Sequence, residues 1–297
     1  MADTMTVGRP GTPDGARRRG VPGARLVTPY QSLLGEPGAP GFVTAGVLGR
    51  FPLSMLGLGA VLLVSALTGS YGLAGAVSAT LAVSSSAAAP AIGVLSDRRG
   101  QRPVLLAGLT LHLLGVGGLV ATVVGHAPAW AYFPPAALAG AATPQVGAFV
   151  RARWTALVGG GARLHAAFSL ESALDEFVFV VGPVLATFLS SSLWPPAGVV
   201  AAAVLAGTGS LLLAGQRRTE PTPIPVPVGG GARPGSALRV PGLRVVVLSF
   251  VAVGATFGTI EVSMVAFAQE HGSTAAAGPL LAVLAFGSLL AGLWYGT

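Results

Sequence analysis

Five ionisable side chains interrupt stretches of sequence that are otherwise almost entirely apolar. They are Arg50, Glu171, Asp175, Glu176 and Glu261. A charge at the centre of a lipid bilayer costs about 2.5 to 3.5 kcal/mol even on insertion scales, so it is found mainly where it pairs, moves protons or contacts a ligand. Glu171 and Asp175 are spaced i, i+4 and share one face of a helix, with Glu176 one position further round. The pattern indicates charge pairing and proton transfer inside a membrane.

Arg50 and the three acids near residue 175 are predicted to lie at similar depths, because their segments enter the membrane from the same side. We therefore expect Arg50 to pair with Glu171 or Asp175. The alternative for Glu171 is that its side chain extends to the lipid headgroups, as long charged side chains do. Asp175 is too deep in the membrane to do so easily.

Glu261 lies in a different apolar segment from the other acids. Gly254 and Gly258 precede it at a small-xxx-small spacing that lets another helix approach closely. A partly desolvated carboxylate at such a position suits reversible protonation or contact with a cationic cargo. The alternative is an acid that is hydrogen-bonded within the packing or placed at the outer interface.

A second cluster combines charged residues with glycines. Its members are Gly93, Asp97, Arg98, Gly100 and Arg102. Gly93 permits close helix approach, Asp97 can accept charge-assisted hydrogen bonds from arginines or meet a helix N-terminus, and Gly100 permits a tight turn. Arg98 and Arg102 are expected to hold this loop at the membrane surface. A generic positive loop between two helices is the alternative interpretation.

The composition places these residues in a membrane protein. Hydrophobic residues make up 52% of the chain and charged residues 9%, against ~25% charged residues in soluble domains. The mean hydropathy is +0.74. The net charge of +7 does not indicate nucleic-acid binding, because the arginines punctuate apolar runs instead of forming a solvated basic face.

No feature of the sequence predicts an enzyme, a metal site or a cofactor. The chain has no cysteine, and its four histidines show no ligand spacing. All 17 basic residues are arginine, so the chain lacks the lysine of a phosphate-binding loop and cannot be an ATP-driven pump by itself. His165 and Ser169 share a helix face, but no oxyanion site accompanies them. A channel would need repeated pore-lining charge or a filter segment, and neither is present.

Hydropathy predicts eight membrane-spanning helices of about 20 residues each. We place them at 42–67, 71–95, 103–125, 129–150, 165–190, 196–215, 244–268 and 275–296. Every arginine except Arg50 falls in alternate gaps between these spans, in the N-terminal segment or, for Arg244, at the first residue of a span that follows such a gap. Because basic residues bias orientation, we expect those gaps and the N-terminus to be cytoplasmic and the chain to lie in the cell membrane.

The predicted organisation has four parts. Residues 1–41 are expected to form a disordered, basic cytoplasmic tail, since they lack the apolar core of a signal peptide. Residues 42–215 form an N-terminal bundle of six helices, and residues 216–243 form a proline- and glycine-rich cytoplasmic linker. Residues 244–297 supply the first two helices of a second bundle.

The loop cluster reads Gly-x-x-x-Asp-Arg-x-Gly-x-Arg and lies between the second and third predicted helices. It resembles the signature of the major facilitator superfamily. The resemblance implies an all-α, polytopic helical bundle in which this loop is a conformational gate. It also implies a secondary active transporter whose partners are the lipid bilayer, a small-molecule substrate and protons.

Gly182 and Pro183 in the fifth predicted span resemble the Gly-Pro pair of drug/proton antiporters in this family. The following residues, Val184 to Ala186, depart from the antiporter pattern, which has a further glycine pair. The fourth predicted span also lacks the basic residue that many proton-coupled members carry there. The resemblance favours proton-coupled export of a small organic molecule or drug, and uptake of a sugar or metabolite is the alternative.

Members of the family have twelve helices in two lobes, whereas eight are predicted here. We therefore expect the sequence to be truncated after the eighth helix, with the remaining helices supplied by a longer gene or by a second chain. A membrane fragment that transports nothing by itself is the other alternative.

Overall fold

The computed structural model of the chain describes residues 30–223, 241–273 and 276–295, and this part contains helices and no strands. The all-α, multi-span fold expected from the sequence is confirmed. The first 29 residues of the predicted tail and residues 224–240 of the predicted linker lie outside the described residues. The side chains of Pro241, Glu261 and residues 288–295 also lie outside the description.

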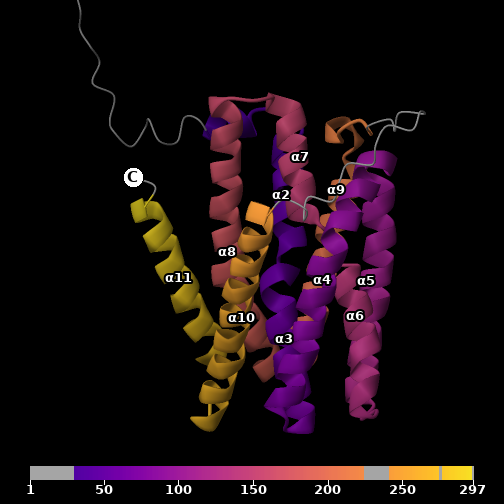
Figure 1. Cartoon of the computed structure of the whole chain (residues 1–297), viewed down its shortest axis with the longest axis vertical. Coiled ribbons are helices and arrows are strands. Elements are labelled where there is room, and N and C mark those ends of the chain that lie inside the picture. The colour runs from indigo at the N-terminus through magenta and orange to yellow at the C-terminus, as the bar shows by residue number, and fades with distance from the viewer. Residues whose placement is uncertain (1–29, 224–240, 274–275, 296–297) are drawn as a thin grey trace, which may run out of the picture.

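The helices run along a common direction, and the chain passes back and forth between the two ends of the bundle (Figure 1). In chain order they are α2 (Ala39–Arg50), α3 (Pro52–Thr68), α4 (Tyr71–Arg99), α5 (Gln101–Val124), the 3₁₀ turn η1 (Ala129–Tyr132), α6 (Phe133–Ala141), α7 (Val146–Val158), α8 (Ala162–Ser192), α9 (Ala197–Gly215), the 3₁₀ turn η2 (Arg217–Thr219), α10 (Pro241–Glu270) and α11 (Ala277–Tyr295).

Six helices in the described part are long and apolar enough to cross a membrane. They are Ala39–Thr68, which joins α2 and α3, then α4, α5, α8 and α9, and Gly242–Glu270 of α10. They correspond to the first, second, third, fifth, sixth and seventh predicted spans. α11 coincides with the eighth predicted span, and its apolar described part, Ala277–Gly287, is shorter than a full crossing.

The fourth predicted span is not one continuous helix. It divides into α6 and α7, separated by residues 142–145. Pro144 has no backbone N–H and disfavours the helical conformation of the residue before it, so the helix ends ahead of it and restarts at Val146. The restarted helix continues to Val158, beyond the predicted limit of residue 150. The prediction of a single span at 129–150 was wrong in this respect.

The disordered tail predicted at residues 1–41 also includes residues that are ordered in the structure. Residues 30–34 are helical, and the Leu33 side chain is buried against the apolar cluster around Phe42 and Trp154. The first crossing begins at Ala39. Burial of apolar side chains near the membrane surface orders this segment, which composition alone had assigned to the tail.

Loops that carry arginine lie at one end of the bundle (Figure 1). We call it the arginine-rich end, and it is formed by the α4–α5 turn, the α7–α8 turn and η2, which carry Arg98, Arg99, Arg102, Arg163, Arg217 and Arg218. Two glycines with positive φ make its tight turns possible, since Gly100 has φ +87° and Gly161 has φ +77°.

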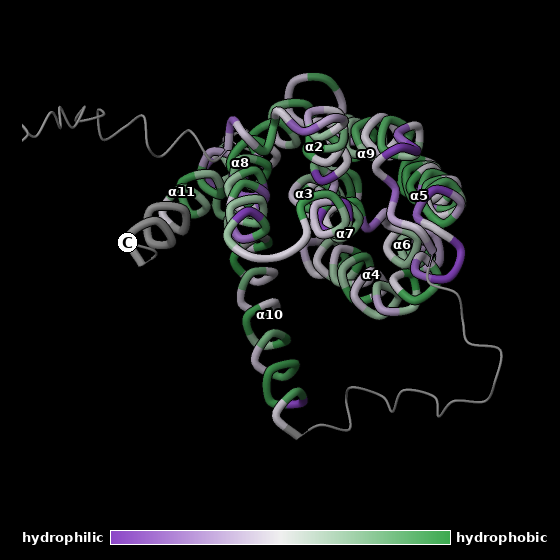
Figure 2. Tube along the Cα trace, turned by 90° about the horizontal axis from the view of Figure 1, so that it is seen from above, coloured by the Kyte–Doolittle hydropathy of each residue, from purple (hydrophilic) through white to green (hydrophobic). Residues whose placement is uncertain are grey.

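We call α2 to α9 the six-span part, because the sequence predicts six spans over these residues. It meets α10 and α11 at the opposite end. There Tyr71 Oη donates to Gln269 Oε1, and Gly278 of α11 packs directly against the backbone of Pro183. Residues 242–259 of α10 are exposed, and α11 leans away from α8 toward its C-terminal end (Figure 1). Viewed from above, α10 and α11 stand outside the ring of α2 to α9 (Figure 2). The two parts therefore touch at one end and are separate at the arginine-rich end.

Glycine allows a very close contact between α2 and α9. A Cβ atom on Gly209 would overlap the backbone N and Cα atoms of Gly49, whereas a Cβ on Gly207 would meet no atom within 4 Å. Backbone atoms cannot move aside as a flexible side chain can. The α2–α9 contact therefore requires glycine at position 209.

We expect Gly209→Ala to destabilise the protein by about 1 to 3 kcal/mol, the usual cost of overpacking, and to lower the unfolding temperature in detergent. Gly207→Ala on the same helix is the control and should be neutral or slightly stabilising, because alanine favours helix by about 1 kcal/mol over glycine. Circular dichroism during heating measures both. Equal unfolding temperatures for the two variants would contradict the close α2–α9 contact.

Candidate functional site

Arg50 is the last residue of α2 and its side chain is 1% exposed. Its Nε donates to Gly46 O at 3.0 Å, and its Nη1 donates to Asp175 Oδ1 at 2.7 Å. Its Nη2 forms an ion pair with Glu171 Oε2. The structure thus brings Arg50 to both of the acids named as its possible partners, which project from α8.

The second oxygen of each acid is bound by α7. Trp154 Nε1 donates to Glu171 Oε1 at 2.8 Å, and Arg151 Nη2 donates to Asp175 Oδ2 at 2.6 Å. Glu171 is fully buried, whereas Asp175 is 25% exposed and Arg151 is 39% exposed. We call Arg50, Arg151, Glu171 and Asp175 the four-charge network.

The four-charge network contains two guanidinium groups and two carboxylates, so it is neutral when both acids are ionised. Neutrality and complete hydrogen bonding are what allow charges to remain in an apolar interior. Protonation of one acid would leave one uncompensated positive charge. Asp175 is the more accessible of the two acids and is therefore the member best placed to exchange a proton with water.

Two predicted intramembrane acids are not in the network. Glu176 lies on α8 with a partly exposed side chain and takes part in no ion pair of the described residues. Glu261 lies in α10, but its side chain is outside the description. The sequence-based suggestion that Glu261 exchanges protons therefore stays a prediction.

We call residues 93–102, the loop expected to act as a gate, the gate loop. Only some of its residues have the environment that the sequence predicts. Gly100 makes the turn between α4 and α5, as expected. A Cβ on Gly93 would meet no atom within 4 Å, so the expectation that Gly93 allows close helix approach was wrong for the described helices. Asp97 and Arg98 are exposed, and neither is in an ion pair of the described part. Arg102 donates its backbone N–H to Glu220 Oε1 at 2.8 Å.

Arg153 is the residue that sequence analysis missed. Its side chain is fully buried, with Nε donating to Gln101 Oε1 at 2.9 Å and Nη2 donating to Leu213 O at 3.0 Å. Its Nη1 donates to Gln216 O and Thr219 Oγ1, both at 2.9 Å. Through these bonds, Arg153 of α7 connects α5, at the end of the gate loop, to the start of the linker. The sequence showed it only as one more arginine between two spans.

Gly182 and Pro183 lie where three helices crowd together. A Cβ on Gly182 would overlap Ser54 Oγ of α3, and Ser54 Oγ donates to Val178 O at 2.9 Å. On the other side of α8, Gly278 of α11 packs on Pro183 O. The Gly-Pro pair is therefore a contact point between the six-span part and α11.

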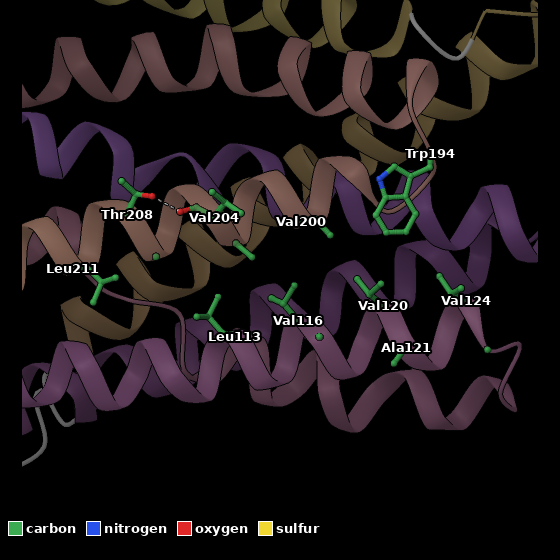
Figure 3. A pocket seen from close by; sticks show the side chains of 14 residues that line it. Leu113, Val116, Val120, Ala121, Val124, Trp194, Val200, Val204, Thr208 and Leu211 are labelled. Atoms are coloured by element: carbon green, nitrogen blue, oxygen red, sulfur yellow. Dashed lines mark hydrogen bonds between the residues drawn. The ribbon is translucent and has the colours of Figure 1, made fainter.

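A large apolar groove lies between α5 and α9 (Figure 3). None of the residues that line it belongs to the four-charge network. Its volume is about 800 Å³, and the only side-chain hydroxyl in it, Thr208 Oγ1, donates to Val204 O. The indole N–H of Trp194 is the only other polar side-chain group among the lining residues, and no lining side chain carries a charge. The groove is therefore not the site of charge chemistry.

Four other polar side chains of the predicted spans are bonded within their own helices or turns. Ser169, Ser172 and Thr259 donate to the carbonyls four residues earlier, and Gln145 Nε2 donates to Thr143 O. Such local bonds satisfy the side chains without a ligand. Within the residues described, no group of three or more metal-binding side chains comes together.

Arg50→Ala should lower the yield of folded protein sharply, because it leaves Glu171 buried and without its cation. Breaking a buried ion pair from one side costs about 3 to 5 kcal/mol. The double variant Arg50→Ala/Glu171→Gln should recover part of the yield, since it removes the orphaned charge.

Arg163→Ala is the matched control for this test, because it breaks the exposed Arg163–Glu36 pair and should change stability by about 1 kcal/mol at most. Size-exclusion chromatography of detergent extracts gives the folded yield. A wild-type yield for Arg50→Ala would refute the structural importance of the network.

Comparison with known proteins identifies the chain at family level. No curated protein and no solved structure matches it. The sequence profile of the Major Facilitator Superfamily matches residues 42–297, which include the gate loop, the four-charge network and all the described helices from α3 to α11. The chain belongs to the major facilitator superfamily of membrane transporters.

Proposed function

We propose that this protein couples the movement of protons to the export of a small organic molecule across the cell membrane. The observation that carries the proposal is the position of Asp175. One carboxylate, 25% exposed, bridges the buried Arg50 of α2 and the half-exposed Arg151 of α7. A proton acceptor that also joins three helices can link its protonation state to their arrangement.

The coupling step follows from the charge balance of the network. When Asp175 takes up a proton, it loses its negative charge and can no longer neutralise both arginines. Arg50 keeps Glu171 as a partner, whereas Arg151 has no other acid in the described structure. Loss of the Arg151–Asp175 ion pair then loosens α7 from α8, and repulsion between the two guanidinium groups favours separation of α7 from α2. Release of the proton restores the bridge.

Alternating access is the second element of the proposal. Among the described side chains, the six-span part and the pair α10–α11 touch at the end opposite the arginine-rich end, where Tyr71 and Gln269 are hydrogen-bonded. This arrangement corresponds to a transporter that is open at the arginine-rich end. Rocking of one part against the other around a central site would open the other end.

The gate loop is assigned to the same end. Glu220 caps the first turn of α5, where a carboxylate interacts favourably with free N–H groups and the helix dipole. We propose that Asp97, Arg98 and Arg102 contact the second part when the arginine-rich end closes. Export is preferred over uptake because Pro183, of the Gly182–Pro183 pair that resembles antiporters, lies at the contact with α11.

Asp175→Asn should abolish the dependence of transport on a proton gradient. Purified protein is reconstituted into vesicles with an imposed pH gradient, and accumulation of ethidium, a fluorescent cationic probe, is followed. We expect gradient-driven accumulation to fall to the level without a gradient, because asparagine cannot release a proton. Glu176→Gln is the control at the next position and should keep accumulation within about twofold of wild type, because a partly exposed acid outside any ion pair contributes little. Gradient-driven accumulation that persists in Asp175→Asn would refute the coupling role.

Glu261→Gln in the same assay separates the two candidate proton sites. If coupling resides in the four-charge network, the pH dependence of ethidium accumulation should stay as in wild type. A flattened pH profile for Glu261→Gln, with a normal profile for Asp175→Asn, would move the coupling role from α8 to α10.

A further inference from the structure

His112 of α5 is a fully buried histidine that takes no part in the site described so far. Its Nδ1 lies 2.8 Å from Ala139 O of α6. A carbonyl oxygen only accepts hydrogen bonds, so Nδ1 must carry the proton and donate. The other ring nitrogen, Nε2, has no hydrogen-bond partner in the described structure. The side chain therefore acts through a single donated bond.

The carbonyl of Ala139 needs that donor because of the break in the fourth crossing. In a continuous helix, Ala139 O would accept from the N–H of Thr143. Here the Thr143 N–H donates to Gly140 O at 3.0 Å instead, and the next residue, Pro144, has no N–H. Ala139 O accepts from His112 Nδ1 and from Thr143 Oγ1, the latter at 2.9 Å. Two side chains thus replace the backbone donor that the break removes.

α6 is held rigidly at this point. A Cβ on Gly115 of α5 would overlap the backbone N of Ala139, and a Cβ on Gly140 would overlap Leu81 O of α4. The backbone of α6 is therefore wedged between two helices beside His112. A donor fixed on α5 determines where α6 ends and in which direction α7 begins.

The direction of α7 decides whether the four-charge network can form. α7 packs along α2. A Cβ atom added to Gly49 would lie 3.3 Å from Cβ of Val146, and the ring centroids of Phe42 and Trp154 are 4.8 Å apart. The same helix carries Arg151 to Asp175 and Trp154 to Glu171. A shift of α7 by one residue would rotate both donors away from the acids, since successive helical residues are about 100° apart.

We propose that His112 is a positioning residue for the four-charge network: its Nδ1–H stabilises the end of α6 and so fixes the register of α7 against α2 and α8. The inference concerns the geometry of the network and stands whether or not Asp175 exchanges protons. It predicts that position 112 requires an N–H donor where Nδ1 lies. A side chain that only filled the space would create no such requirement.

The register of α7 can be measured directly, because the chain contains no cysteine. The double variant Gly49→Cys/Val146→Cys places two Cβ atoms near the separation that disulfides need, so mild oxidation of membranes should cross-link it. The cross-link is detected after proteolysis between the two positions. The same double variant is then combined with substitutions of His112.

His112→Asn should keep the cross-link near its original yield, because the asparagine amide can place an N–H close to the position of Nδ1. His112→Leu has no donor and should reduce the cross-link at least roughly fivefold, as expected for loss of a buried hydrogen bond worth about one power of ten in equilibrium. His112→Gln should resemble His112→Leu, because its amide extends toward the position of Nε2. His165→Leu, which removes an exposed histidine, is the control and should leave the cross-link unchanged.

Three outcomes would overturn the proposal. Full cross-linking in His112→Leu would show that the donor is not needed, and equal loss in His112→Asn and His112→Leu would show that the imidazole is needed only for packing. If His112→Gln preserved the cross-link as well as His112→Asn does, a donor at the position of Nδ1 would not be what α6 requires. If His112→Leu does not reach the membrane folded, the folded yields of His112→Asn and His112→Gln make the same comparison.

Discussion

A guanidinium group buried in an apolar interior must have its charge neutralised and its N–H groups hydrogen-bonded by the protein, because water does not reach it. Arg50 imposes that requirement on three helices at once. Its partners come from α8, and the second oxygens of those partners are occupied by α7. Neither helix can slide without exposing an unpaired charge to the membrane interior. The break in the fourth crossing, the wedged position of α6 and the glycine contact of α2 with α9 all support that arrangement.

The sequence predicted the ion pairing well, because it shows the sign of each charge and how deep each charged residue lies in its apolar run. Arg50 and Glu171 stood at comparable depths in apolar runs, and opposite charges at equal depth in a membrane have few other partners. The break at Pro144 was not predicted, because the apolar character of the run continues across it. Arg151 was therefore read as a loop charge, although it lies in a helix and reaches Asp175. Hydropathy averages over a window and does not register the loss of a single N–H.

Two regions among the apolar helices differ in how their few polar atoms are hydrogen-bonded. Around Arg50, polar atoms are few; Arg50 Nε bonds within α2, and the other bonds join different helices. In the groove between α5 and α9, small side chains leave space and Thr208 bonds only to its own helix (Figure 3). Cavity size alone would direct attention to the groove. The distribution of charge directs it to α2, α7 and α8, where a change of protonation state has structural consequences.

Arg153 differs from Arg50 in the kind of acceptor it uses. Two of its four partners are main-chain carbonyls, those of Leu213 and Gln216. Every amino acid supplies a carbonyl, so substitutions at those two positions leave the acceptors in place. The two main-chain bonds are thus robust to substitutions at positions 213 and 216, whereas the other two bonds depend on the side chains of Gln101 and Thr219.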